Sequence, residues 1–436
     1  MPLIARTLLL ALSCTTSAAR LEVFGFGTSG WQSYDWDVIT TACSVSLNIV
    51  ADFAPGGAQE GLPALAHAHG ARVVIFANAV RNGTAALPLD PGGAGSAAAA
   101  ARAVWVAEAA ALVERFSLDG INFDYEQPLN ASDPRVEGYV ALVADTRAAL
   151  RAAHAARVGS AGGDPTDPTD HSDPQQSRAG RLAPQISVDV GWSVDIDGRY
   201  YDGAGFAAHA DYLYVMGYDV QSQYAPDTTD GRCHARANAP LGSLRAGLRA
   251  WIERGVPAAQ LLLGVPWYGF GYSCLDNEDG PGADAAAPAP SPSPSPSPSP
   301  CAIAAVPFRG SPCSDAAGGE QAYVTLSPHL RANEGTLRWD GNSSSPFFEY
   351  VVATAGGCSG RGGVGSRCRV WFDNPRSLAA KLALVAELQL GGGGPYEFSD
   401  LDYSGSSEQG KNDTAAMWQT LRDFAQRQER NASNAS

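Results

Sequence analysis

The feature that most constrains the fold of this chain is a regular alternation of strand-like and helix-like patterns. Runs rich in β-branched and aromatic residues recur through the 436 residues, at 21–27, 43–50, 71–77, 118–125, 185–192, 212–218, 261–268 and, more weakly, 394–403. Patterns typical of helices lie at 96–116, 136–156, 241–254, 377–390 and 414–428. Strands that alternate with helices indicate a parallel sheet. Eight such strands predict an α/β fold, a (β/α)8 TIM barrel with loop insertions.

Two stretches of biased composition interrupt the predicted barrel domain, which spans residues 20–426. Residues 159–178 are rich in Gly, Asp, Pro and Ser, which predicts a disordered insertion. Residues 281–300 contain a Ser-Pro repeat, which predicts an extended, polyproline-like loop. Barrel-like patterns continue beyond the repeat, so we interpret it as an insertion and not as a linker between domains. The polar composition of residues 427–436 predicts a frayed tail.

The beginning of the chain predicts export into the secretory pathway. Arg6, a short apolar run at 8–12 and small residues at 16–19 are typical of a signal peptide, here residues 1–19. Six N-x-S/T sequons agree with this route, at Asn82, Asn130, Asn342, Asn412, Asn431 and Asn434. We expect a lysosomal or an extracellular protein, and the sequence leaves the two open.

The cysteines suit an oxidising compartment. Cys358 and Cys368 flank a glycine-rich loop, and we expect them to pair. Four more are expected to form two bridges whose connectivity stays open, because four cysteines allow three pairings: Cys233, Cys274, Cys301 and Cys313. Cys43 is left over in an apolar run and is expected to be a buried free thiol.

The charge of the chain excludes some partners. Asp and Glu number 45 against 30 Lys and Arg, which gives a formal charge of −15. Phosphate backbones and anionic membranes attract basic surfaces, so we expect neither nucleic acid nor a membrane as partner. No C-x-x-C pair and no pair of histidines at metal-ligand spacing occurs, so we expect no metal and no cofactor. We expect a monomer that binds a neutral ligand such as a sugar.

The stretch 119–126, DGINFDYE, carries the chemistry. Alternate residues of a strand share a face, so Asn122, Asp124 and Glu126 point one way while Ile121 and Phe123 point toward the helices. The polar row ends the strand, where barrel enzymes place their active sites. Two carboxylates about 6 to 7 Å apart between Cα atoms raise the pKa of one of them by repulsion and burial.

A carboxyl group that stays protonated near neutral pH can act as a general acid, as glycoside hydrolysis requires. The alternatives are a structural polar cluster or a metal site. Buried paired acids without a basic partner are costly for structure alone, and a metal would need more ligands. Asp119 faces away from Glu126, and we expect it to make structural hydrogen bonds.

The same stretch resembles the D-x-x-D-x-D-x-E signature of glycoside hydrolase family 18, with Asn122 in place of the usual Asp. That substitution resembles the di-N-acetylchitobiase branch. Further segments resemble the same branch, and the similarity runs from about residue 22 to about residue 423: 33–36 (SYDW), 215–219 (VMGYD), 237–240 (ANAP), 264–269 (GVPWYG), 306–310 (VPFRG), 371–375 (WFDNP) and 401–405 (LDYSG).

The resemblance implies a retaining mechanism in which the substrate supplies the nucleophile. Glu126 would protonate the glycosidic oxygen and then activate water. Asp124 would hold the acetamido N–H of an N-acetylglucosamine, and Tyr218 would bond the acetamido oxygen. The branch implies the chitobiose core of oligosaccharides from degraded glycoproteins as substrate, and the lysosome as compartment.

Four further residues are candidates for substrate binding. Asn122 is one, and Asp219 could bond a sugar hydroxyl or cap a helix. Trp31 could stack on a sugar or pack in the core. Tyr396 falls where family members usually carry a Trp at the floor of the sugar site, and Tyr can also stack on a sugar.

Three activities remain open. An exo-acting chitobiase, an endo-acting chitinase and an inactive chitin-binding lectin share this family. The presence of Glu126, Asp124 and Tyr218 argues against the lectin.

Overall fold

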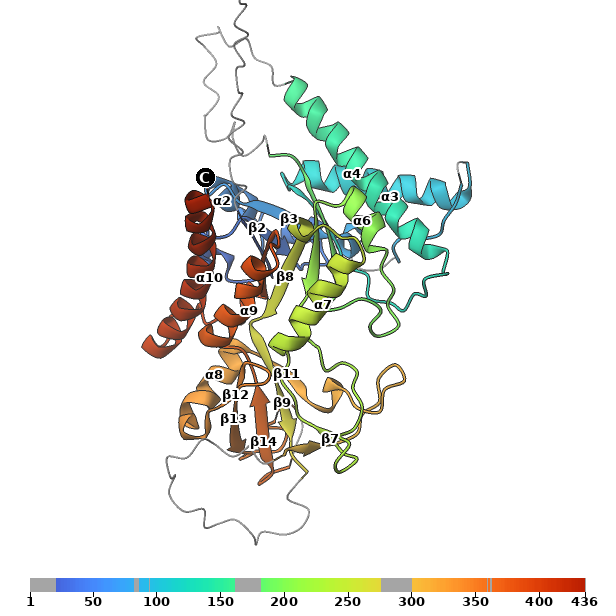
Figure 1. The fold of residues 1–436 in the computed structure, drawn as a ribbon. Coiled ribbons are helices and arrows are strands. Elements are labelled where there is room, and N and C mark those ends of the chain that lie inside the picture. The colour runs from blue at the N-terminus through green and yellow to red at the C-terminus, as the bar shows by residue number, and fades with distance from the viewer. Residues whose placement is uncertain are drawn as a thin grey trace, which may run out of the picture.

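A computed structural model describes residues 21–81, 86–93, 95–160, 182–275, 300–358, 360 and 363–435. Eight parallel strands close into a barrel in the order β1-β15-β8-β6-β5-β4-β3-β2 (Figure 1). The strands are β1 (Glu22–Gly27), β2 (Thr41–Ser44), β3 (Arg72–Phe76), β4 (Gly120–Phe123), β5 (Gln185–Gly191), β6 (Tyr212–Met216), β8 (Leu261–Pro266) and β15 (Gly392–Tyr396). The predicted (β/α)8 barrel is therefore confirmed.

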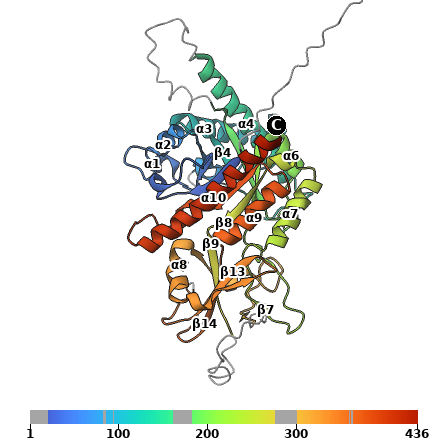
Figure 2. The ribbon, with the colours of Figure 1, turned by 60° about the vertical axis from the view of Figure 1, so that its left-hand side comes forward.

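Helices surround the barrel on its outer side (Figures 1 and 2). They are α1 (Ile49–Asp52), α2 (Leu62–Ala68), α3 (Ala97–Arg115), α4 (Arg135–Ser160), α6 (Gly203–His209), α7 (Leu241–Glu253), α9 (Pro375–Glu387) and α10 (Glu408–Ala435). Strand alternation divides the apolar residues into two clusters. Val23 and Ile121 pack against the helices, whereas Phe24, Phe26 and Tyr214 fill the barrel interior.

Two strand predictions needed correction. The run 43–50 forms only the short strand β2, and its end turns into α1. The eighth strand lies at Gly392–Tyr396 and not at 394–403. A Cβ at Gly392 would lie 1.9 Å from the Glu22 carbonyl oxygen, and one at Gly394 would lie 2.0 Å from that of Phe24. The strand is built of glycine because the neighbouring backbone comes so close, and glycine carries no strand signal.

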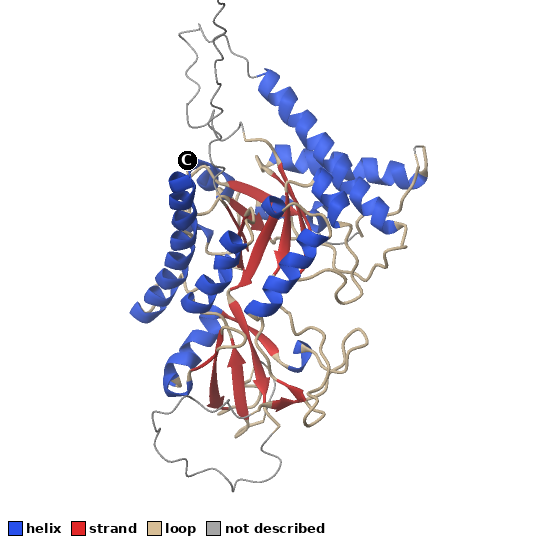
Figure 3. Ribbon diagram, viewed as in Figure 1, coloured by secondary structure: helices blue, strands red, loops and turns tan. Residues whose placement is uncertain are grey.

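The chain between β8 and α9 forms an insertion that contains a second, antiparallel sheet outside the barrel. Its strand order is β11-β9-β14-β13-β12 (Figure 3). Its strands are β9 (Tyr268–Ser273), β11 (Gly319–Ala322), β12 (Arg338–Asp340), β13 (Ser345–Val351) and β14 (Arg367–Trp371). Helix α8 (Tyr323–Ala332) follows β11, and β7 (Cys233–His234) pairs with β10 (Ala302–Ile303). Barrel elements do continue beyond the Ser-Pro repeat, with α9, β15 and α10, but residues 301–371 come first and belong to this insertion, which the sequence did not predict.

Short 3-10 helices complete the chain: η1 (Trp31–Ser33), η2 (Ala77–Arg81), η3 (Ala258–Gln260), η4 (Asp315–Ala317), η5 (Glu334–Thr336) and η6 (Phe398–Asp400). Helix α10 runs to Ala435, so the tail predicted to be frayed belongs to a helix, which packs beside α9 (Figure 2). The signal peptide and nearly all of the two predicted insertions, 159–178 and 281–300, lie outside the described residues.

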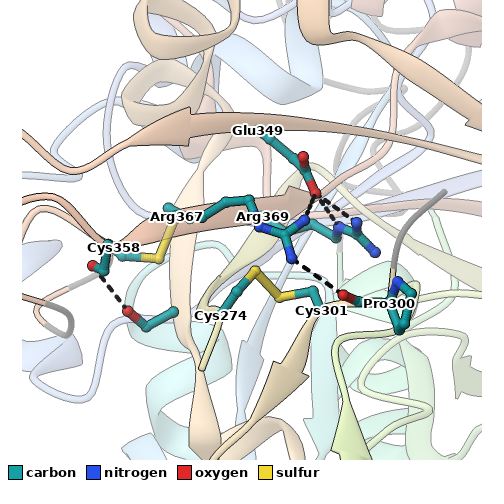
Figure 4. The surroundings of a disulfide bond; sticks show 10 residues. Cys274, Pro300, Cys301, Glu349, Cys358, Arg367 and Arg369 are labelled. Atoms are coloured by element: carbon teal, nitrogen blue, oxygen red, sulfur yellow. Dashed lines mark hydrogen bonds and ion pairs between the residues drawn. A yellow bond between two sulfur atoms is a disulfide. The ribbon is translucent and has the colours of Figure 1, made fainter. Parts of the chain in front are cut away.

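Three disulfides hold the insertion and the loop after β6. Cys358 pairs with Cys368 as predicted, and the open set resolves into Cys233–Cys313 and Cys274–Cys301. Cys43 is free and buried, as expected. Figure 4 shows Cys274–Cys301 beside an ion-pair cluster in which Arg367 and Arg369 donate to Glu349 at 2.9 and 2.8 Å. Arg367 also donates to the carbonyl oxygen of Pro300 at 3.1 Å, which ties the disulfide to β14.

Candidate active site

The polar row of β4 lies as its alternation predicts. Ile121 and Phe123 are buried among the helix-facing residues, while Asn122 is buried on the opposite side. Asp119 accepts hydrogen bonds from His67 at 2.7 Å and from the Val73 amide at 2.8 Å, which confirms its structural role. The row Asn122, Asp124 and Glu126 therefore starts inside the barrel and ends at its carboxyl rim.

The side-chain amide of Asn122 bonds to strand β5. Its Nδ2 donates to Ser187 Oγ at 2.9 Å and to Asp189 Oδ1 at 2.8 Å. Burial, with repulsion from Asp124, raises the pKa of Asp189 well above its usual range. Sequence reasoning missed Asp189, although the alternation in QISVDVG places Ser187 and Asp189 on one face, paired with the face of β4 that carries Asn122.

Asp124 is a buried acid whose pKa the site raises. Burial and the nearby Glu126 raise the pKa of Asp124 to about 7, and Arg199 opposes them. Its Oδ1 is buried and has no hydrogen-bond partner among the described residues. A half-protonated carboxyl group with a free oxygen, close to neutral pH, can both donate and accept a hydrogen bond.

Glu126 stands at the rim, with 49% of its side chain exposed, and forms an ion pair with Arg199. Arg199 comes from the loop after β5 and also pairs with Asp197 at 2.9 Å. The expectation that the two acids lack a basic partner is therefore wrong. Arg199 lies 73 positions along the chain from Glu126, and no spacing in the sequence connects them.

Three tyrosines form an aromatic wall next to the acids. Tyr218 follows β6, Tyr396 ends β15, and their ring centroids lie 5.4 Å apart. Tyr268 at the start of β9 lies 5.9 Å from Tyr218 and 6.2 Å from Tyr396. Burial raises the pKa of Tyr218 well above its usual range, so its hydroxyl keeps its proton and can donate. The structure places Tyr396 at the end of the eighth strand, beside Tyr218.

Asp219 belongs to the same group of residues. It accepts a hydrogen bond from the Tyr268 hydroxyl at 2.6 Å, and its amide donates to Asn238 Oδ1 at 2.7 Å. No helix begins at Asp219, so the capping alternative does not hold. Burial raises its pKa to about 7, with smaller contributions from Glu320 and Glu126. The structure therefore brings Asp219 to the rim together with Glu126.

Trp31 lies apart from these residues. Its side chain is buried in the helix-facing core, with an exposed fraction of 8%, and its indole donates to the Ala58 carbonyl at 3.0 Å. Trp36 packs beside it and donates to the Trp31 carbonyl at 2.8 Å. Trp31 therefore takes the packing role, and its expected place among the substrate-binding residues is corrected.

Within the described ranges, no group of three or more His, Cys, Asp or Glu side chains could hold a metal ion. The site instead offers acids with raised pKa values, the guanidinium of Arg199 and an aromatic wall. These lie at the carboxyl end of a parallel barrel, the arrangement of a barrel glycoside hydrolase.

The family model of the glycosyl hydrolases family 18 matches residues 92–400, more than half of the chain. The chain belongs to this family and is a glycosidase.

Relatives and solved structures agree with this assignment. The chain is 32% identical over 404 residues to di-N-acetylchitobiase of Homo sapiens, covering 92% of this chain and 83% of that protein. It is 30% identical over 415 residues to probable di-N-acetylchitobiase 2 of Dictyostelium discoideum, covering 93% and 87%. Its fold resembles a class V chitinase from Nicotiana tobaccum, with a TM-score of 0.58 at 16% identity over 92% of this chain and 99% of that one.

Proposed function

We propose that the chain hydrolyses the β-1,4 linkage of N-acetylglucosamine oligosaccharides with the chitobiose core as preferred substrate. The curated relatives are named di-N-acetylchitobiases, and a structural neighbour from Cycas revoluta binds (GlcNAc)3. The observation that carries the proposal is the division between the two acids of β4. Asp124 is buried with one oxygen unpartnered, whereas Glu126 is half-exposed at the rim.

This division favours substrate assistance. Asp124 and Glu126 both follow the end of one strand, so both lie on the same side of a bound sugar. An ordinary retaining glycosidase needs a second carboxylate about 5 to 5.5 Å away across the scissile bond. In the proposed mechanism the 2-acetamido oxygen of the substrate takes that part.

The positions of the groups support the following steps. Glu126 gives its proton to the glycosidic oxygen as the C1–O bond breaks, and the acetamido oxygen bonds to C1. Asp124 accepts the acetamido N–H, and Tyr218 donates to the acetamido oxygen, which stabilises the charge that develops. Water then attacks C1 and loses a proton to Glu126, while the C1 bond to the acetamido oxygen breaks.

The remaining binding residues take supporting parts. Tyr396 provides a ring for the apolar face of the sugar, and Asp219 bonds a hydroxyl. Asn122 orients Asp189 below Asp124. No cofactor takes part in this proposal, and the enzyme acts as a monomer without nucleic acid or membrane partners.

The compartment belongs to the same proposal. The described residues contain three disulfides, which persist in oxidising compartments. The sequons at Asn130, Asn342 and Asn412 are exposed. Within the described ranges, none of the helices has the length and apolar character needed to cross a membrane. We infer a secretory route that ends in the lysosome or outside the cell, with glycoprotein oligosaccharide breakdown as the role.

The test is hydrolysis of N,N′-diacetylchitobiose and of a longer N-acetylglucosamine oligomer by the wild type and by Glu126→Gln. The variant should lose more than about a hundredfold in kcat on the disaccharide, because it has no proton to transfer. The matched control is Glu137→Gln, an exposed position on α4, which should keep full activity.

Other outcomes would reassign the protein. Cleavage of the longer oligomer alone would make it an endo-acting chitinase. Sugar binding without cleavage of either substrate would make it a lectin and overturn the catalytic proposal.

A further inference from the structure

We propose that Arg199 is a positioning residue that fixes which oxygen of Glu126 transfers the proton, and that Arg309 of the insertion fixes the backbone beneath it. This inference rests on the proposed function of Glu126. It adds two residues from outside β4 to the machinery that protonates the leaving group.

The contact between Arg199 and Glu126 carries the first step. Arg199 Nη1 donates to Glu126 Oε2, and the Arg199 side chain is only 10% exposed. A guanidinium has five donors and no acceptor. The oxygen that it holds must therefore act as acceptor, and the acidic proton of Glu126 must sit on the other oxygen, Oε1. Arg199 thereby leaves Oε1 free to face the glycosidic oxygen.

Arg199 is itself held in place. Its Nη2 donates to Asp197 Oδ2 at 2.9 Å, and the Asp197 side chain is 3% exposed. Ser222, from the loop after β6, donates to the same Asp197 oxygen at 2.9 Å. The Arg199 amide closes a turn onto the Ile196 carbonyl at 2.8 Å. These contacts leave the guanidinium little freedom, and Asp197 balances part of its charge.

Arg309 reaches the same place from the insertion. Its Nη2 donates to the backbone carbonyl of Glu126 at 3.0 Å, and its Nη1 donates to that of Asp197 at 3.1 Å. One guanidinium therefore joins the backbone of the acid to the backbone that carries the partner of Arg199. A fork of this kind sets the distance between two chain segments, which a lysine could not do.

The turn that carries Arg309 is itself anchored. The amides of Phe308 and Ser311 each donate to the other's carbonyl at 3.0 Å, and Gln223 donates to the Arg309 carbonyl at 2.8 Å. The Cys233–Cys313 disulfide follows four residues later. The insertion therefore supports the position of the acid through one covalently anchored turn.

The test uses the acidity of the leaving group. A dinitrophenyl glycoside of N-acetylglucosamine departs without a proton, whereas the sugar leaving group of N,N′-diacetylchitobiose needs one. Arg199→Met should lower kcat/KM by about a hundredfold on the disaccharide and by less than about fivefold on the dinitrophenyl glycoside, because only the first reaction uses general acid catalysis. KM should change little.

Two further variants separate positioning from folding. Arg199→Lys should recover part of the loss, since an ammonium can still donate to one Glu126 oxygen but cannot also fork to Asp197. Arg309→Met should show the same leaving-group dependence with a smaller loss, of about tenfold, because it acts through the backbone. Thermal melting of each variant checks that it folds.

The outcomes distinguish this inference from the proposed function. Equal losses on both substrates, or no loss on either, would overturn the role of Arg199. If Glu126→Gln shows the leaving-group dependence while Arg199→Met does not, the inference alone fails. If Glu126→Gln shows none, the proposed function fails as well.

Discussion

The barrel and the insertion sheet are stabilised in different ways. The barrel strands have no open edge, and their two faces pack into a helix-facing core and an interior core. Its one cysteine, Cys43, is buried and unpaired. The insertion sheet has two edges, β11 and β12, and every disulfide of the described residues lies in it or joins it to the loop after β6.

The difference shows which structural role each of the two parts has. A small sheet buries too little apolar surface to be stable alone, and cross-links compensate. The barrel bears the acids of β4 and β5. The insertion adds single contacts at the rim, through Tyr268 and Arg309. Chemistry should therefore depend on barrel residues first, and cross-links should matter mainly where they hold those rim contacts.

The sharpest test of the barrel's part is Asp124→Asn. The amide cannot balance the charge of the acetamido intermediate, so kcat/KM on the disaccharide should fall by about a thousandfold, or roughly 4 kcal/mol. The melting temperature at pH 7.5 should stay the same or rise, because a buried acid with an unpartnered oxygen is removed. Asp145→Asn, an exposed position, serves as control. Full activity of Asp124→Asn would refute the proposed role.

The insertion's part is tested by the double variant Cys233→Ser with Cys313→Ser. Opening a bridge across a sequence separation of 80 should lower the free energy of unfolding by about 2–4 kcal/mol, measured by urea denaturation. Loosening the Arg309 turn should also lower kcat/KM by roughly tenfold. The control is Cys358→Ser with Cys368→Ser, which opens a separation of 10 and should leave kcat/KM unchanged. Equal activity losses in both variants would contradict the comparison.

A further test is the dependence of the free energy of unfolding on pH, to which the buried acid Asp124 contributes. Asp124 titrates near 7 when folded and near 3.8 when unfolded, so between these values the folded state binds more protons. The free energy of unfolding should therefore decrease as pH rises through this interval, by at most about 1.4 kcal/mol per pH unit for one group. Denaturation at pH 5, 6 and 7.5 should show a shallower decrease in Asp124→Asn. An identical slope in both proteins would show that Asp124 titrates normally.

The sequence predicted the parts of the molecule that local patterns encode. Six barrel strands are apolar runs that their length and β-branched residues reveal, and the parity of 121–126 agrees with the positions of Asp124 and Glu126. The run 43–50 overlaps β2 only at its first two residues. The eighth strand shifted because Gly392 to Gly394 have no side chains to signal a strand. The insertion sheet was missed because the run 261–268 covers β8 and only the first residue of β9, and no predicted strand covers β14.

The features that the sequence did not predict depend on contacts between segments that are distant along the chain. Asp189 could have been found by applying the parity argument of β4 to β5. Arg199 and Arg309 could not, because their partners lie 73 and 183 positions away. For Trp31 the sequence left two roles open, stacking on a sugar and packing in the core. Its burial depends on the packing of residues near Ala58, which no local pattern reports.

The pairing of β1 with the glycines of β15 has a consequence for biosynthesis. Residues Glu22 and Val23 pair with Gly392 and Gly393. The first strand to be synthesised therefore cannot pair with β15 until nearly the whole chain has been made. Until then β1 and β8 present open edges that can pair with other chains. A nascent or truncated chain that stops before Gly392 therefore lacks the strand that closes the barrel.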